Sequence, residues 1–107
     1  MRLLAEGRWA LLAALIMSAA HAQVEERVKA CATCHGADGN SLTAGIPSIA
    51  AQPRIFLENY LVMTREGIRG LGDMQVLLKG VPDQDIVAMA KHYTALPAKP
   101  VSSSVDE

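Results

Sequence analysis

The stretch Cys31-Ala32-Thr33-Cys34-His35 contains both cysteines of this 107-residue chain. A C-x-x-C pair in a thiol redox protein normally follows a strand, whereas Val24 to Ala30 has a helical pattern, with two valines four residues apart. A structural zinc site needs four ligands, and only His92 could join these three. The full C-x-x-C-H pattern is typical of covalent haem attachment, so the stretch favours a haem protein.

The spacing of the motif explains this chemistry. Residues three apart on a helical turn point the same way, so Cys31 and Cys34 can both reach the two vinyl groups on one edge of a porphyrin. The imidazole of His35 then projects over the ring, where it can bind iron. We therefore predict one haem c, bound covalently through Cys31 and Cys34, with His35 as an axial ligand.

The first 22 residues have the pattern of a secretory signal peptide. Arg2 and Arg8 give a basic start, Ala10 to Ala20 is almost wholly apolar, and Ala20-His21-Ala22 is a small-x-small cleavage site. An uncleaved membrane anchor is the alternative, but the apolar run is about half of the roughly 20 residues that span a bilayer. We expect cleavage before Gln23, a location in the periplasm, and no stable membrane insertion afterwards.

The mature part would have 85 residues, with eight basic and ten acidic side chains once Arg2, Arg8 and Glu6 are removed. It contains no run of Lys or Arg, which argues against nucleic acid and anionic membranes as partners. Its aromatic residues are only Phe56, Tyr60 and Tyr93. So thin a core needs another buried group, which the haem would supply.

The rest of the chain predicts an all-α domain with three main helices wrapped around one covalent haem. Turn formers dominate Gly36–Pro47 and Ile68–Asp73, which we expect to be irregular. Prolines and apolar spacing predict the helices and the domain limits. The expected segments are a helix at Val24–Ala30, a helix from Pro53 to Glu66, a helical turn at Gln75–Lys79, a helix from Pro82 to Leu96, a haem domain over 23–97 and a disordered tail over 98–107.

Iron bound to His35 has one further axial position, and its candidates are Met63, Met74, Met89 and His92. Met63 and Met89 lie mid-helix, where methionine usually fills a core, and His92 suits a surface position. Met74 lies in the Gly-rich irregular segment, 39 residues beyond His35, so a loop could carry its thioether to the metal. We predict Met74 as the second ligand, with an open or His-ligated site as the alternative. A thioether favours ferrous iron and suits an electron carrier.

Three segments together resemble small bacterial class I cytochromes c: residues 31–41, residues 45–50 (Gly-Ile-Pro-Ser-Ile-Ala), and Met74 placed eight residues before the helix start at Pro82. The resemblance is strongest to the cytochrome subunit of flavocytochrome c sulfide dehydrogenase and to single halves of two-haem periplasmic cytochromes c. It covers the chain from Val24 to about Leu96. It implies a class I cytochrome c fold and electron transfer.

The resemblance also implies a role for Pro47, whose counterpart offers its backbone carbonyl to the free nitrogen of the proximal histidine. Read from the residues alone, Pro47 is a turn proline. Two positions depart from the family pattern. Pro82 stands where Ser or Thr usually caps the last helix, and Ala51 replaces a glycine often found before the position of Gln52.

These observations predict electron transfer, either as a free carrier or as the cytochrome subunit of an oxidoreductase such as a flavin-containing sulfide dehydrogenase. The partners would then be redox proteins, including a flavoprotein subunit. A haem-based sensor or binding protein for small ligands is the alternative. We expect no catalytic residues, because Asp38, Asp83 and Asp85 suit turns and helix starts, and therefore no enzyme activity in the chain itself.

Overall fold

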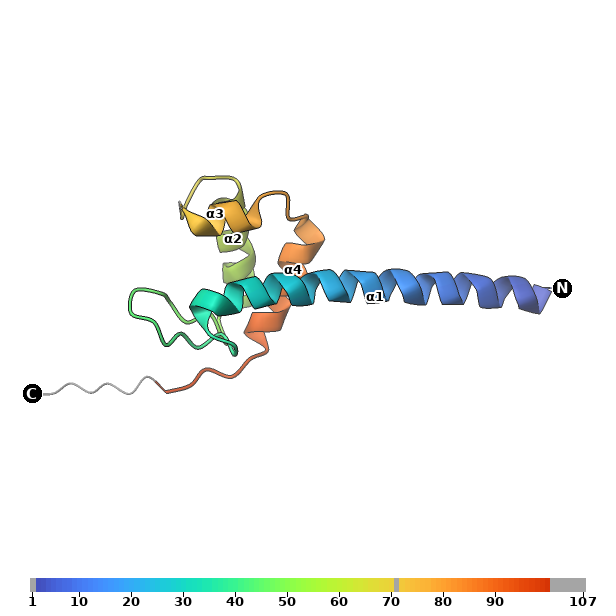
Figure 1. Cartoon of the computed structure of the whole chain (residues 1–107), viewed down its shortest axis with the longest axis horizontal. Helices are drawn as coiled ribbons and strands as arrows, with labels where there is room; N and C mark the ends of the chain where they lie inside the picture. Colours follow the sequence, from blue (N-terminus) through green and yellow to red (C-terminus); the bar gives the residue numbers. More distant parts are fainter. Residues whose placement is uncertain (1, 71, 101–107) are drawn as a thin grey trace, which may run out of the picture.

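The computed structural model describes residues 2–70 and 72–100, which form helices and connecting loops without strands. The all-α prediction is confirmed. Three longer helices and one short helix follow one another along the chain (Figure 1). They are α1 (Arg2–His35), α2 (Arg54–Arg65), α3 (Asp73–Leu78) and α4 (Asp83–Thr94).

Helix α1 is much longer than the helix predicted at Val24–Ala30, and its two halves differ. Its N-terminal half projects away from the other helices (Figure 1). Within the described chain, no helix is both long and apolar enough to cross a membrane. Six large apolar side chains of this half are more than half exposed: Trp9, Leu11, Leu12, Leu15, Ile16 and Met17.

The C-terminal turns of α1 pack against a core built mainly by α2 and α4. Val24 contacts one buried cluster and Val28 contacts the other, while Cys31 contacts both. The apolar stripes predicted for the second and fourth helices supply most of these residues. The first cluster comprises Leu78, Val81, Ile86 and Met89, and the second comprises Leu57, Ala90 and Tyr93.

Pro53 and Pro82 occupy the N-cap positions of α2 and α4, one residue before the first-turn positions predicted for them. Both have extended ψ angles, of 134° and 155°, and neither cap has a side-chain hydrogen bond. At the other end of α2, Gly67 takes a φ of +71°, which ends the helix as predicted.

Helix α3 corrects one prediction. We expected Ile68–Asp73 to be irregular and placed Met74 in this loop, but Asp73 and Met74 are the first two residues of α3. The carboxylate of Asp73 lies in the first turn of α3, where it interacts favourably with the positive end of the helix dipole. Gly72, with a φ of +107°, lets the chain turn just before the helix begins. Met74 is therefore held on a helix that packs against α2.

The loop from Gly36 to Pro53 folds back on itself and onto α4. The carbonyl of Gly39 accepts hydrogen bonds from the N–H groups of Ile49 and Ala50, and the N–H of Ala51 donates to the carbonyl of Tyr93 at 3.0 Å. Ala51 is the only non-glycine residue with a positive φ in the described part of the chain, at +59°. The glycine expected at this position from the resemblance would adopt this conformation without strain.

The predicted tail begins at residue 98, and residues 101–107 of it lie outside the described residues. The N–H of Lys99 donates to Oδ1 of Asn40 at 2.9 Å, and its ammonium lies 2.6 Å from a carboxylate oxygen of Asp38. The amide of Asn40 also donates to the carbonyl of Pro97 at 3.1 Å. Asn40 and Asp38 thus connect the chain after α4 to the loop after α1.

Candidate haem site

The last turn of α1 carries Cys31, Cys34 and His35. The Cys31 thiol is half-buried and the Cys34 thiol is exposed, and no disulfide joins them. His35 is only 9% exposed. Gly36 follows with a φ of +88°, and a Cβ at this position would overlap the carbonyl of Asn40, so glycine allows the chain to turn back directly after the histidine.

This turn brings the loop back to His35. Nδ1 of His35 lies 2.7 Å from the carbonyl oxygen of Pro47. A carbonyl can only accept a hydrogen bond, so Nδ1 must carry the proton and donate it. In the neutral ring Nε2 then has a free lone pair, which is the form of histidine that binds a metal.

His35 and Cys31 line a cavity of about 470 Å³. This volume lies within the range of about 300–1,000 Å³ that is common for cofactor and ligand sites. Its wall is mostly apolar and includes Phe56 of α2, which is 53% exposed. The other lining residues are Ile46, Pro47, Ser48, Ile49, Gln52, Leu57, Tyr60, Leu61, Met74, Met89, Ala90 and Tyr93.

The composition of this wall fits a haem. A porphyrin is a broad, largely apolar ring with a metal at its centre, and the cavity offers an apolar wall together with one oriented imidazole. Two thiols on the same helix end supply the attachment chemistry. Met74, whose side chain is half-buried, lines the same cavity.

The four candidates for the second iron ligand have different surroundings. Met74 and Met89 both line this cavity, but Met89 is 2% exposed and belongs to a core cluster. Met63 lines a different cavity on the α4 side of α2. His92 is exposed on α4, where its ring stands edge-on to the ring of Tyr93, with 4.9 Å between the centroids.

Burial also sets the protonation state of two groups in the wall. It raises the pKa of the Cys31 thiol, and it raises the pKa of the Tyr93 phenol well above its usual range. The phenol therefore stays neutral and can act as a donor, and its oxygen lies 3.4 Å from the carbonyl of Val28. Tyr93 thus links α4 to the turn of α1 that precedes the cysteines.

The described residues do not form the group of ligands that a zinc site would require. Among residues 2–70 and 72–100, no three His, Cys, Asp or Glu side chains are grouped so that they could hold a metal ion. His92, the fourth ligand that a zinc site would have required, does not line the cavity with Cys31 and His35.

Several lining residues were not predicted from the sequence. Ser48 and Gln52 come from a loop without periodicity, and Met89 was assigned to the core alone. The ion pair between Arg27 and Asp85, with 3.1 Å between Nε and Oδ2, was also missed, because Asp85 was interpreted only as a helix-start residue. The signal that could have found Arg27 is its position one turn before Cys31.

No family model matches the chain. Cytochrome c-554(548) of Halomonas halodenitrificans is 31% identical over 74 residues, which cover 66% of this chain and 89% of the relative. Cytochrome c4 of Pseudomonas aeruginosa is 33% identical over 71 residues, covering 66% and 35%. A thiosulfate dehydrogenase electron acceptor of Stutzerimonas stutzeri is 36% identical over 70 residues, covering 64% and 32%.

The chain thus spans most of the first relative and about a third of the other two. All three are class I cytochromes c, a class that carries covalent haem c. The chain therefore belongs to the class I cytochromes c, and it transfers electrons through a haem c that is bound covalently through Cys31 and Cys34.

Proposed function

We propose that this protein is a mono-haem electron carrier of the periplasm, in which His35 and Met74 are the axial ligands of the iron. The observation that carries the proposal is the 2.7 Å hydrogen bond between Nδ1 of His35 and the carbonyl of Pro47. It leaves Nε2 of a nearly buried imidazole unprotonated inside an apolar cavity, and this is the arrangement that a proximal ligand needs.

Met74 is the better of the two methionines in the cavity wall. Its side chain is half-buried, so it is not already part of a closed core, whereas Met89 packs among Leu78, Val81 and Ile86. Recruiting Met89 to the metal would remove a core side chain from its contacts. Met74 needs only to turn within a wall that it already lines.

When bound, the haem would supply one-electron redox chemistry between a donor and an acceptor protein. The chain's own residues prepare this exchange. Pro47 holds the His35 ring in one orientation and one tautomer, and the apolar wall excludes water. The neutral thioether of Met74 would favour the reduced state of a haem bound there. No separate catalytic residues are required for this role.

The proposal includes export. The large apolar side chains between residues 9 and 17 are more than half exposed, along a helix that projects from the domain. A segment with this character suits a signal peptide that is removed on the far side of the membrane. N-terminal sequencing of the protein from a periplasmic extract should give Gln23 as its first residue; a chain beginning at Met1 would refute cleavage at this site.

The proposed donors and acceptors are oxidoreductases. One relative is named as the electron acceptor of thiosulfate dehydrogenase, and the resemblance noted from the sequence was to a subunit of a flavin-containing sulfide dehydrogenase. We therefore propose an enzyme that oxidises reduced sulfur as the donor, with a flavoprotein as the finer hypothesis. Mild purification from the native organism should recover such an enzyme together with the cytochrome if the two form a stable complex.

The test of the haem site is a redox titration of the protein as it is isolated, followed by visible absorption. One reversible one-electron step, a haem stain that survives denaturing electrophoresis and the weak methionine–iron band near the red edge are the expected results. Carbon monoxide should leave the spectrum of the ferrous protein unchanged at neutral pH. A clear carbon monoxide shift would contradict ligation by Met74 and favour a binding or sensor role.

A further inference from the structure

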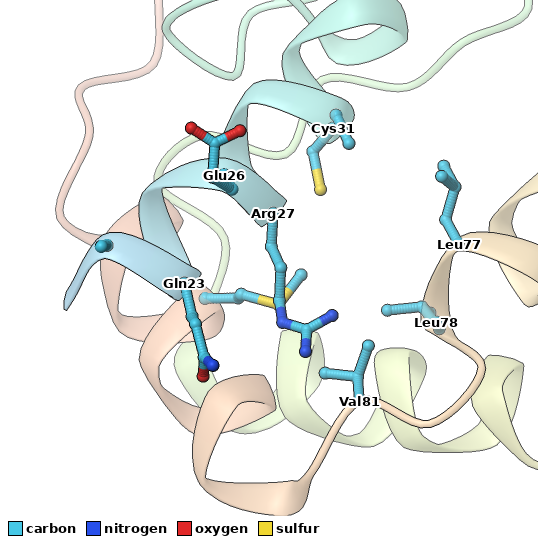
Figure 2. Close-up of a pocket in the computed structure, with 10 residues that line it drawn as sticks. Gln23, Glu26, Arg27, Cys31, Leu77, Leu78 and Val81 are labelled. Carbon is cyan, nitrogen blue, oxygen red and sulfur yellow. The ribbon is translucent and has the colours of Figure 1, made fainter. Parts of the chain in front are cut away.

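A second cavity, of about 510 Å³, also has Cys31 in its wall (Figure 2). It shares Cys31 and Met89 with the haem cavity, so the two spaces meet at these residues. Its wall is mainly apolar and is built by α1, α3, the α3–α4 link and α4. The charged side chains that line it are Glu26 and Arg27.

Arg27 is placed to act on the group bound to Cys31. The two residues are four apart on α1 and therefore lie on the same face, one turn from each other. Figure 2 shows the Arg27 side chain running from α1 into the cavity on the side of Cys31, with its guanidinium beside Val81 and Leu78. Its side chain is 31% exposed.

Asp85 fixes the position of this guanidinium. Its Oδ2 accepts a hydrogen bond from Nε of Arg27 at 3.1 Å, and its side chain is only 8% exposed. Asp85 also lies in the first turn of α4, where the helix dipole favours a negative charge. The carboxylate is thus stabilised from two sides, and the pair connects the haem-bearing helix to α4.

The other charged residue of this wall, Glu26, forms an ion pair outside the cavity. Glu26 is 73% exposed and its carboxylate lies 2.9 Å from the ammonium of Lys29, so solvent screens it. The C-terminal end of α1 presents its negative pole at His35, which favours oxidised iron. Arg27 is the positive group that opposes this pole from within the wall next to Cys31.

Charges in an apolar, partly buried wall act more strongly than charges in water. Reduction adds one negative charge to the haem, so a nearby positive charge favours the reduced state and a nearby negative charge disfavours it. We propose that the Arg27–Asp85 ion pair tunes the reduction potential of the haem: Arg27 raises the potential and Asp85 lowers it. The inference rests on the proposed function, because it requires the haem to occupy the cavity of Cys31 and His35.

The test is to measure the reduction potential of the haem-loaded protein and of the variants Arg27→Gln and Asp85→Asn. Arg27→Gln should lower the potential and Asp85→Asn should raise it. At a fixed solution potential, each should change the ratio of oxidised to reduced protein by about threefold to tenfold, where tenfold corresponds to 59 mV for one electron. Arg27→Lys keeps the charge and should leave the potential close to that of the parent protein.

Two controls separate a charge effect from loosened packing. Arg65→Gln breaks another ion pair to α4, between Arg65 of α2 and Asp83, whose side chain is exposed, and Arg65 lines neither cavity. Lys29→Gln removes an exposed charge from the same turn of α1, on a different face from Arg27. Both should move the potential less than Arg27→Gln does, even where Arg65→Gln lowers the free energy of unfolding as much.

Opposite shifts in the Arg27 and Asp85 variants support the proposal, and any other pattern overturns it. If loosened packing caused the shifts, both variants would change the reduction potential in the same direction. The size of that change would then equal the change in Arg65→Gln at the same loss of stability. Asp85→Asn alone keeps the test decisive if Arg27→Gln does not fold, because only the removal of a negative charge should raise the potential. A normal haem spectrum with unchanged potentials would overturn this inference and leave the proposed haem site standing.

Discussion

The two halves of α1 are one continuous helix, yet they have opposite surroundings. Residues between 9 and 17 expose large apolar side chains, whereas Val24, Val28 and Cys31 pack against the buried clusters of α2, α3, α4 and the α3–α4 link. An isolated helix gains little stability from its own hydrogen bonds in water. The comparison teaches that helix formation alone does not make a segment part of the domain, and that the C-terminal turns belong to it through burial and through the haem.

The largest expected effect follows from removing the haem, which tests whether the C-terminal half of α1 depends on it. In Cys31→Ser/Cys34→Ser the covalent link is lost, and we expect loss of most native helix content, because only eight apolar side chains are buried in the described part of the chain. Far-ultraviolet circular dichroism measures the helix content, and a haem stain measures attachment. Native helix content in the haem-free variant would mean that packing alone holds these turns in place.

The next largest effect concerns the ligand supplied by α3. Met74→Ala should abolish the methionine–iron absorption band and lower the reduction potential, because the soft ligand that favours ferrous iron is removed. Met63→Ala is the matched control, since Met63 lines a different cavity and its truncation should leave the band unchanged. Retention of the band in Met74→Ala would show that another residue, with Met89 first to be examined, binds the iron.

Val28 allows the packing contribution of the C-terminal half of α1 to be measured without touching the haem motif. It contacts the cluster of Leu57, Ala90 and Tyr93, so Val28→Ala should cost about 1 kcal/mol in the free energy of unfolding. Leu42, which is 99% exposed in the loop, is the control, and its truncation should change stability by less than about 0.5 kcal/mol. Chemical denaturation of both variants provides the numbers; equal losses would contradict the assigned packing.

Ala51 extends the comparison to the loop that packs on α4. A φ of +59° is strained for an alanine but not for a glycine. The hydrogen bond from the Ala51 N–H to the carbonyl of Tyr93 holds the residue in this conformation. Ala51→Gly relieves about 1 kcal/mol of strain but also increases the entropy of the unfolded chain, so we expect a stabilisation of about 0.5 kcal/mol. A lower denaturation midpoint would show that the left-handed conformation is not strained in solution.

The smallest effect concerns the surface contact at the far end of this loop. The Lys99 ammonium, and then the Asn40 N–H, lower the pKa of Asp38 to about 2. Because the folded-state pKa lies below the unfolded value of about 3.9, the contact stabilises the fold above pH 4 and is lost as the pH falls towards 2. Asp38→Asn should therefore be slightly less stable than the parent protein at pH 7, with the difference disappearing near pH 2. A difference that persists below pH 2 would exclude this carboxylate as its source.

Much of the site could be predicted from local sequence. Cys31, Cys34 and His35 are adjacent along one helical turn, so their spacing alone defines the attachment chemistry, and apolar periodicity placed α2 and α4 to within two residues. The role of Pro47 was inferred from the resemblance. Met74 was chosen as the second ligand by elimination among four candidates. Met74 was placed in an irregular segment because glycines surround it, whereas the structure places it on α3.

The sequence by itself thus determined the cofactor, the helical class and the end of α1 that carries the motif, because these depend on residues close together along the chain. Only the tertiary structure decided what surrounds the motif. The return of Pro47 to His35 across 12 residues and the pairing of Arg27 with Asp85 across 58 join segments that no local pattern relates. The left-handed conformation of Ala51 is likewise set by its bond to α4. Such contacts depend on which residues are buried and on which distant segments meet in the folded chain, and neither can be read from the sequence alone.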